Sequence, residues 1–509
     1  EDGDADAERQ DVVAGTFVHR PGDVGSALLH AVELVVDAAA APAEEFRRVG
    51  RRRRHVGRAR GAAGQQRSGQ AGAQGGAGGS RQGHRGRIVP RAKSRVAFRP
   101  RLRHARADAS LRPTPQRPVP RRAHPAMIRD PETLEALLAS VRRFVRERLV
   151  PAEREVAETD QVPPDIVQAM RELGLFGLAI PEAYGGLGLT MEEEVRLLFE
   201  LCRTSPAFRS VIGSTVGIGS QGIVMDGTDE QKARWLPAMA RGELVATFAL
   251  TEPEAGSDAA SLRTRARRDG DHYVVNGSKR YITNAPSAGV FTLMARTDPA
   301  STGAAGVSAF IVDAQSPGIR LGRVDRKMGQ QGAHTCDVNF EDCRVPAANL
   351  IGGQEGRGFR TAMKVLDKGR LHIAAVCVGV AERMLDDALR YALERRQFGQ
   401  PIAEFQLVQA MLADSRTELY AARCMVVDAA QRRDAGQDVT AEASCCKLFA
   451  SEMCGRVADR AVQILGGAGY MADHGIERFY RDVRVFRLYE GTSQIQQLII
   501  ARHMIREAS

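Results

Sequence analysis

Near the C-terminus a single carboxylate lies between an aromatic residue and a glycine, in the run Tyr489-Glu490-Gly491-Thr492-Ser493-Gln494. The strongly apolar stretch from Ile495 to Met504 follows and predicts a helix. Glycine lets a ligand approach the backbone, and the start of a helix collects unpaired N–H groups. A carboxylate placed there suits the removal of a carbon-bound proton. The alternative, which an isolated Tyr-Glu-Gly would favour, is an ordinary exposed glutamate where a helix begins.

A second candidate segment is residues 248–258, which read Phe-Ala-Leu-Thr-Glu-Pro-Glu-Ala-Gly-Ser-Asp. Small residues here would let backbone N–H groups face a flat polar ligand, and Thr251 and Ser257 offer hydroxyls. Taken alone, the segment could equally be a strand followed by a capped turn.

Helices are predicted to position these motifs from the N-terminal side. Asp130-Pro131 is typical of a helix start, and apolar residues then recur on one helical face from Leu134 to Leu149. A second helix is predicted from about Pro164 to Leu173, and further helical patterns fill residues 190–242. We therefore expect the part of the folded chain before Thr247 to be helical.

Strand patterns begin at Thr247. Asn276-Gly277 between two extended runs predicts a β-hairpin turn. Further strands are predicted at Val290 to Ala295, at Val307 to Val312 and around the alternating Cys336, Val338 and Phe340. Long helical patterns return over residues 361–394, 402–432 and 441–465. The order of helices, strands and helices predicts an α+β protein with a central strand domain.

The first 126 residues differ in composition from the rest of the chain. They contain no Met, Cys, Trp or Tyr, and they hold 25 of the 72 Lys and Arg residues but only 12 of the 62 Asp and Glu residues. This segment therefore has a formal charge of +13, whereas the remaining 383 residues have −3. Runs such as Arg51 to Arg54 show no helical or strand period, so we expect no packed core here.

Three interpretations of residues 1–126 follow from this composition. Arg-rich segments neutralise nucleic-acid phosphates, but few aromatic residues are present to stack on bases, so nucleic-acid binding is disfavoured. A disordered tail fits the composition as well. We favour upstream sequence translated in error, because the first Met of the chain is Met127 and helix signals begin directly after it.

Cysteine usage and hydropathy argue against several other classes of protein. The eight Cys residues include no Cys-x-x-Cys pair, and no His lies at ligand spacing, so we expect neither a metal site nor a disulfide framework. No run of about 18 or more apolar residues and no secretory signal is visible, so we expect no membrane span and a cytoplasmic protein.

Together the motifs resemble the acyl-CoA dehydrogenase family in order and spacing, over residues 127–509. The segments that carry the resemblance are residues 248–258, Tyr281-Ile282-Thr283-Asn284, Glu394-Arg395-Arg396-Gln397-Phe398-Gly399, Gln463-Ile464-Leu465-Gly466-Gly467 and Tyr489-Glu490-Gly491-Thr492. The resemblance implies an N-terminal helical domain (127–246), a middle β-domain (247–355) and a C-terminal four-helix bundle (356–509). It also implies bound FAD and a homotetramer, since a neighbouring subunit usually holds the adenine end of FAD in this family.

The resemblance assigns cofactor contacts to three groups of residues. Those along the flavin ring are Phe248, Leu250, Thr251, Gly256, Ser257, Tyr281 and Ile282, with Thr283 near its reactive nitrogen. Those for the pyrophosphate and adenosine part are Arg395, Phe398, Gln406, Gln463, Leu465, Gly466 and Gly467, and Thr492 and Gln494 complete the site. An Arg suits pyrophosphate because its planar fork makes paired hydrogen bonds. The alternative for Arg395 is a solvated helix end.

For the substrate, the resemblance implies CoA-thioester contacts from Ser257, Asp367 and Arg370, with Gly491 beside the acyl chain. Asp367 and Arg370 lie three residues apart, so on a helix they could instead pair with each other. The motif around them is closest to short- and branched-chain members of the family.

The implied activity is FAD-dependent α,β-dehydrogenation of an acyl-CoA thioester to a trans-2-enoyl-CoA, as in fatty acid β-oxidation, with electrons passed to an electron-transfer flavoprotein. Glu490 would be the α-proton base, and its backbone N–H with a flavin ribityl hydroxyl would stabilise the enolate. Some family branches carry the base at the position of Gly369, which has no side chain to serve. Tyr281 stands where the family commonly has Trp, which puts redox tuning and partner contact in doubt.

Three alternatives to this activity remain. The first is a flavin oxidase of the same fold that reacts directly with oxygen. The second is a nucleic-acid-binding protein that acts through residues 1–126. The third, a binding module without activity, is disfavoured because the predicted base and cofactor contacts are all present.

Overall fold

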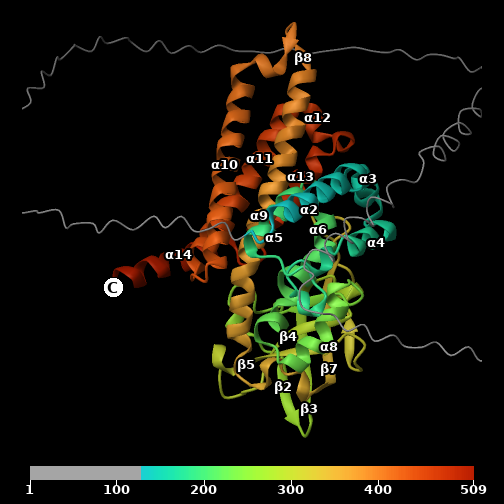
Figure 1. The fold of residues 1–509 in the computed structure, drawn as a ribbon, viewed down its shortest axis with the longest axis vertical. Coiled ribbons are helices and arrows are strands. Elements are labelled where there is room, and N and C mark those ends of the chain that lie inside the picture. The colour runs from blue at the N-terminus through green and yellow to red at the C-terminus, as the bar shows by residue number, and fades with distance from the viewer. Residues whose placement is uncertain (1–127) are drawn as a thin grey trace, which may run out of the picture. The chain divides into compact units, whose positions relative to one another are not determined.

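The computed structural model describes residues 128–509, so the interpretations of residues 1–126 lie outside the described part of the chain. A set of helices comes first, a seven-stranded sheet follows, and long helices complete the chain (Figure 1). This order confirms the predicted α+β class with a central strand domain.

Short helices form the first part. They are α2 (Pro131–Phe144), α3 (Val150–Thr159), α4 (Pro164–Glu172), α5 (Met191–Leu201), α6 (Pro206–Gly213), α7 (Gln221–Asp226) and α8 (Asp229–Ala240). The predicted helix start is confirmed, because the Asp130 side chain accepts hydrogen bonds from the backbone N–H groups of Glu132 and Thr133. This cap satisfies donors that have no partner within the helix. A π-helical segment, Ser214–Gly219, joins α6 towards α7.

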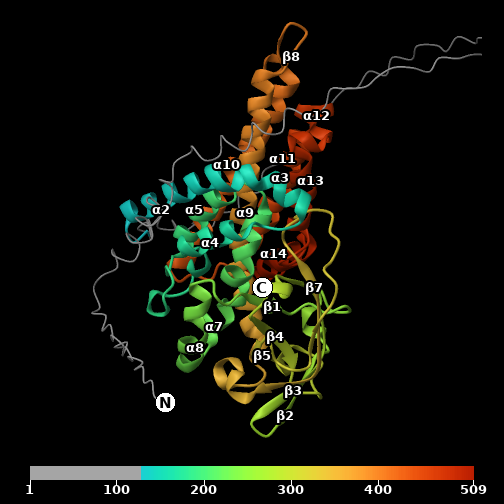
Figure 2. The same cartoon turned by 90° about the vertical axis from the view of Figure 1, so that its right-hand side faces the viewer.

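The strands form one mixed sheet. They are β1 (Ala246–Ala249), β2 (Arg265–Asp269), β3 (His272–Thr283), β4 (Val290–Arg296), β5 (Val307–Asp313), β6 (Ile319–Leu321) and β7 (Thr335–Pro346). The order is β1-β4-β2-β3-β7-β6, with β5 on β4. Every residue of β4 is buried, since α7, α8 and α9 cover one face and other strands' side chains the other (Figure 2). This explains why β4 is mostly apolar rather than alternating, with Thr292 and Arg296 as its polar members.

The hairpin turn predicted at Asn276-Gly277 is wrong. Both residues lie inside the long strand β3, and the chain turns instead at Gly270-Asp271, between β2 and β3. A Cβ at Gly277 would lie 2.5 Å from Thr264 Oγ1, and the pairing of β3 with β7 shifts at this point. The glycine is therefore needed for close approach of a neighbouring segment at a bulge, not for a turn.

Long helices dominate the third part. Its elements are α9 (Gly358–Glu394), β8 (Arg396–Gln397), β9 (Gln400–Pro401), α10 (Gln406–Asp434), α11 (Thr440–Leu465), α12 (Gly467–Tyr470), α13 (Ile476–Asp482) and α14 (Ser493–Ala508). Helix α9 begins against the sheet and continues beside α10 and α11, so one helix links the strands to the bundle (Figure 1). Helix α14 contacts α11 and points away from the other helices (Figure 1).

Candidate active site

Glu490 lies in the turn between a 3₁₀ helix, Val483–Arg487, and α14. The backbone is left-handed at Glu490 (φ 55°) and at Gly491 (φ 86°). A residue with a side chain costs about 1–2 kcal/mol in this conformation. Thr492 then caps α14, because its Oγ1 accepts a hydrogen bond from the Ile495 N–H at 3.2 Å. The sequence prediction of a carboxylate at the start of a helix is confirmed, and its backbone is strained.

The Glu490 side chain faces α9. Its Oε2 atom is buried and makes no hydrogen bond to any residue of the described part. A Cβ added at Gly369 would lie 2.5 Å from this oxygen and 3.5 Å from Ile218 Cγ2. The two positions at which the family carries a base, 369 and 490, therefore lie next to each other in space. Of the two, only Glu490 has a side chain.

Burial raises the pKa of Glu490, and the positive charges of Arg209, Arg370 and Lys447 oppose this rise. A carboxylate in low-dielectric surroundings accepts a proton more readily than one in water. The arrangement therefore favours Glu490 as a general base.

A buried network of hydrogen-bonded polar side chains ends at Arg209. Arg209 Nε donates to His372 Nε2 at 3.0 Å, and His372 Nδ1 lies 2.6 Å from Glu194 Oε1. Burial lowers the pKa of His372 to about 4, with the Arg209 charge as the second cause, so the ring is neutral at pH 7. Because Nε2 accepts from Arg209, Nδ1 carries the proton and donates to Glu194.

The same network extends to Lys368, whose Nζ lies 2.9 Å from the other carboxylate oxygen of Glu194. Burial would raise the pKa of Glu194, but the Lys368 charge and the His372 hydrogen bond outweigh it and lower the pKa to about 2. No pattern in the sequence indicates this network. Its members are far apart in the chain, since His372 and Glu194 are separated by 178 positions, and no local spacing signals such a contact.

The segment proposed to line a flavin, residues 248–258, is hydrogen-bonded to a buried lysine of β3. Lys279 Nζ donates to Leu250 O at 3.0 Å and to Glu252 Oε1 at 2.7 Å. The Arg280 N–H donates to Thr251 O at 2.8 Å. Burial lowers the pKa of Lys279 to about 8, against the effect of Glu252. These bonds bring residues 250–252 beside Tyr281, although the two motifs are distant in sequence.

Tyr281 lies at an irregularity in β3, where the pairing with β7 shifts between Lys279 and Ile282. Its backbone is left-handed (φ 58°), and its side chain is 59% exposed with the Arg280 guanidinium 4.8 Å from the ring centre. The ring is therefore directed outward rather than into the sheet. Its exposure leaves a flat aromatic face open to a ligand or partner.

The residues around the 250–257 segment and the end of β3 fit a flat polar ligand such as the flavin ring. The hydroxyls of Thr251, Ser257 and Thr283 make no hydrogen bond to another described residue. A Cβ at Gly256 would meet nothing within 4 Å. Free hydroxyls beside open space can serve a ligand with both donors and acceptors.

The residues predicted to hold the adenosine part lie elsewhere. Arg395 and Phe398 belong to the β8–β9 hairpin region at the end of α9 remote from the sheet (Figure 1). A ring contact of 6.0 Å between Tyr391 and His474 brings the end of α9 beside the segment that follows α12. Gln406, Gln463, Gly466 and Gly467 are exposed at the bundle surface, whereas Leu465 is buried. Within one chain, the predicted cofactor residues thus form two separate groups.

The Arg395 side chain makes no hydrogen bond or ion pair with another described residue, whereas its neighbour Arg396 donates to Gly399 O at 2.9 Å. Phe398 is 94% exposed. An unpaired guanidinium beside an exposed aromatic ring is typical of a surface that a ligand or another subunit covers.

Asp367 and Arg370 form the internal ion pair that the sequence left open, through Arg370 Nη1 and Asp367 Oδ1. Arg370 is buried, and its Nε has no partner in the described chain. Burial raises the pKa of Asp367, against the Arg370 charge. Ser257, the third predicted substrate contact, is exposed on its loop.

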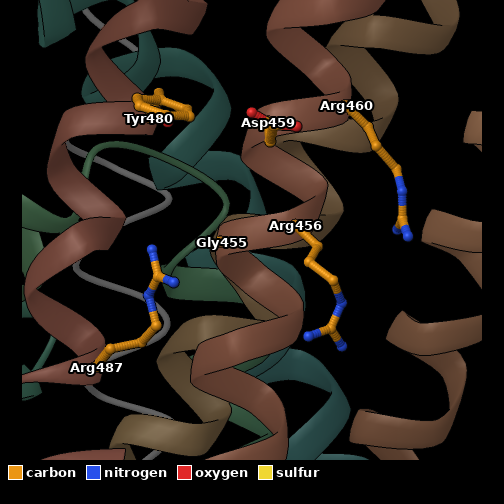
Figure 3. Close-up of a pocket in the computed structure, with 6 residues that line it drawn as sticks. All are labelled: Gly455, Arg456, Asp459, Arg460, Tyr480 and Arg487. Carbon is orange, nitrogen blue, oxygen red and sulfur yellow. The ribbon is translucent and has the colours of Figure 1, made fainter.

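A shallow cavity of about 380 Å³ lies between α11 on one side and α13 with the segment that follows it on the other. Its lining is Gly455, Arg456, Asp459, Arg460, Tyr480 and Arg487 (Figure 3). Arg456 and Arg460 both pair with Glu418, and they point away from Arg487 (Figure 3). The cavity contains none of the predicted site residues, and its cations are already paired.

Within residues 128–509, no group of three or more His, Cys, Asp or Glu side chains could hold a metal ion. In the same range, no helix is both long and apolar enough to span a membrane.

Family models cover nearly all of the described chain. The acyl-CoA dehydrogenase N-terminal domain matches residues 131–243, the middle domain residues 247–343 and the C-terminal domain residues 356–505. These limits follow the succession of helices, sheet and helices in the structure.

Curated relatives and solved structures agree with these matches. An acyl-CoA dehydrogenase of Bacillus subtilis is 41% identical over 72% of this chain and 96% of its own. A subunit of the caffeyl-CoA reductase-Etf complex of Acetobacterium woodii is 42% identical over 69% of this chain and 93% of its own. The structure of butyryl-CoA dehydrogenase from Megasphaera elsdenii aligns with a TM-score of 0.71 and 34% identity, over 73% of this chain and 98% of the other.

Proposed function

Because the chain belongs to the acyl-CoA dehydrogenase family, an FAD-dependent group of oxidoreductases, we propose that it removes one hydrogen from each of the α- and β-carbons of an acyl-CoA thioester. The product is a trans-2-enoyl-CoA. Glu490 is the base in this proposal. The observation that carries it is the buried Oε2 atom of Glu490, which has no partner in the described chain and faces the empty position at Gly369.

FAD supplies the acceptor for the β-hydrogen and its electron pair when bound. Glu490 Oε2 takes the α-proton, and the electrons of the broken Cα–H bond form the new Cα–Cβ double bond. The Glu490 N–H makes no hydrogen bond to another described residue, and we assign it to the thioester oxygen, where negative charge develops. Thr251, Thr283 and Tyr281 are proposed to orient the flavin ring.

The electron acceptor proposed for the reduced enzyme is an electron-transfer flavoprotein. Support comes from the Acetobacterium woodii relative, which is named as part of a complex with such a protein. Exposed Tyr281 and its neighbour Arg280 would present a flat cationic and aromatic surface beside the flavin edge.

Reduction of an enoyl-CoA is the second candidate, because the same relative is named a reductase. The same atoms serve in reverse, with protonated Glu490 returning a proton to the α-carbon. The free-energy difference between the substrate couple and the electron partner decides the direction.

A homotetramer is also proposed. Arg395 and Phe398 lie at the bundle end away from Glu490, so one cofactor could contact both groups only across a subunit interface. Large apolar side chains exposed at or near this end support such an interface, and they are Leu393 (58%), Phe398 (94%), Leu407 (81%), Tyr470 (82%) and Met471 (57%). Sedimentation of the purified protein at a monomer mass would contradict this assembly.

The proposed reaction is tested with the purified protein and its Glu490→Gln variant. The wild type is expected to show a flavin spectrum that bleaches when acyl-CoAs of graded length and branching are added anaerobically. Glu490→Gln should retain FAD but lose turnover by about 10³-fold, because the amide cannot accept the α-proton.

Several outcomes decide against the proposal. Unchanged turnover in Glu490→Gln, or a purified wild type without flavin, would exclude Glu490 chemistry of this kind. Rapid reoxidation of the bleached enzyme by air alone would favour the oxidase alternative.

A further inference from the structure

Two buried side chains hold the Glu490 turn by its carbonyl groups. Gln496 Nε2 donates to Glu490 O and to Gly491 O, both at 3.0 Å. Lys447 Nζ, from α11, donates to Gly491 O at 2.7 Å. Both donor side chains are fully buried. The backbone on the C-terminal side of Glu490 is therefore fixed by two different helices, α11 and α14.

These hydrogen bonds explain how the strained backbone of the turn is held in place. Two consecutive residues adopt positive φ, and one of them, Glu490, has a side chain. Such a conformation persists only where surrounding structure determines it. Because the restraints act through the two carbonyls, the Glu490 N–H remains free for another acceptor, as does Oε2 of its side chain.

Lys447 is a costly choice if its only task is to hold one carbonyl. Burial lowers the pKa of Lys447 to about 8, which reflects the free-energy cost of placing an ammonium away from water. The only hydrogen bond that its ammonium group makes in the described chain is the one to Gly491 O, a neutral acceptor. A neutral donor would satisfy that acceptor at lower cost.

The charges around Lys447 indicate which carboxylate it serves. The groups that act on it are Cys377 and Arg370 from α9, Glu452 from α11, and Glu490. Glu452 is already engaged, because it accepts from Ser493 Oγ at 2.6 Å and from Arg487 Nη1 at 3.3 Å. Glu490 is the acidic neighbour whose Oε2 has no partner.

We propose that Lys447 and Gln496 are positioning residues for Glu490, in that they fix its carboxylate and its N–H in one reactive arrangement. Lys447 has the added role of keeping that carboxylate ionised in readiness for the α-proton. The inference rests on the proposed function of Glu490. It assigns roles to two residues that contact neither the α-carbon nor the flavin in this proposal.

The test compares Lys447→Met and Gln496→Met with a matched control, Gln231→Met. Gln231 is also buried, and its Nε2 also bridges two backbone carbonyls, Ala348 O at 2.8 Å and Leu350 O at 2.7 Å. All three variants are expected to have a lower melting temperature. Only Lys447→Met and Gln496→Met should lose kcat, by about 10- to 100-fold and by more than KM changes, because they displace the base and the Glu490 N–H, which act mainly in the transition state.

The pH profile separates the charge of Lys447 from its hydrogen bond. Glu490 must be deprotonated to act, so kcat falls as the pH drops through its pKa in the complex. Arg209, Arg370 and Lys447 all favour the ionised form. Removing the Lys447 charge should therefore move the acid limb of kcat to higher pH, in Lys447→Gln as well as in Lys447→Met, but not in Gln496→Met.

A crystal structure of Gln496→Met gives a readout that does not depend on turnover. The expected result is a changed or disordered turn at Glu490 and Gly491. If Lys447→Met does not fold, Lys447→Gln, which keeps a donor, supplies the pH profile. An unshifted acid limb in a folded Lys447 variant, or kcat in Gln496→Met equal to that of Gln231→Met, would overturn the inference. An inactive wild type would instead refute the proposed function.

Discussion

At the scale of single residues, the site depends on the absence of a side chain at Gly369 as much as on the presence of Glu490. A Cβ at position 369 would lie 2.5 Å from Glu490 Oε2, too close for either group to stay in place. Gly369→Ala should therefore lower kcat by about 10- to 100-fold through displacement of the base. Because alanine favours the helix by about 1 kcal/mol, the melting temperature should not fall as it does in a general packing defect.

Gly222→Ala is the matched control for this substitution. Gly222 is also a buried helical glycine, in α7, but a Cβ there would meet its nearest neighbours at an ordinary distance of 3.5 Å. Its kcat should equal that of the wild type. Equal kcat values for Gly369→Ala and the wild type would show that the Glu490 carboxylate does not occupy the position described.

At the scale of elements, β3 connects the proposed flavin edge to the rest of the sheet, and Gly277 permits its bulge. Gly277→Ala should destabilise the protein by about 2–3 kcal/mol, because its Cβ would lie 2.7 Å from the Thr264 Cα as well as 2.5 Å from Oγ1. Gly270→Asn should cost less than about 1 kcal/mol, since nothing lies within 4 Å and Asn tolerates φ of 62°. Chemical denaturation measures both, and equal losses would contradict this assignment of the two glycines.

The error at Asn276-Gly277 shows what local sequence can and cannot predict. Caps such as Asp130 and the apolar period of α2 act within a few residues, and both were predicted correctly. The Asn-Gly signal is equally local, but a distant segment around Thr264 determines its conformation. The same limit applies to the site, where Glu490 was recognisable and Lys447, 43 positions earlier, was not.

At the scale of the whole molecule, the residues assigned to FAD are divided between two regions of the described chain. Thr283 ends strand β3 of the sheet, whereas Arg395 lies at the end of α9 remote from the sheet (Figure 1). No hydrogen bond or ion pair in the described chain engages the Arg395 guanidinium. Arg395 could therefore contact FAD only if the remote end of α9 in one subunit lies against the FAD-binding region of another subunit.

This division predicts that Arg395→Ala weakens FAD binding without altering the chemistry at Glu490. Loss of a charge-assisted contact to pyrophosphate should raise the Kd for FAD by about 10- to 100-fold. Added FAD should restore kcat, and KM for acyl-CoA should stay unchanged. Arg416→Ala, at another exposed arginine without a partner in the described chain, is the control and should retain FAD. A Kd for Arg395→Ala equal to that of the control would exclude Arg395 from the cofactor site, because removing a guanidinium that contacts the pyrophosphate must weaken FAD binding.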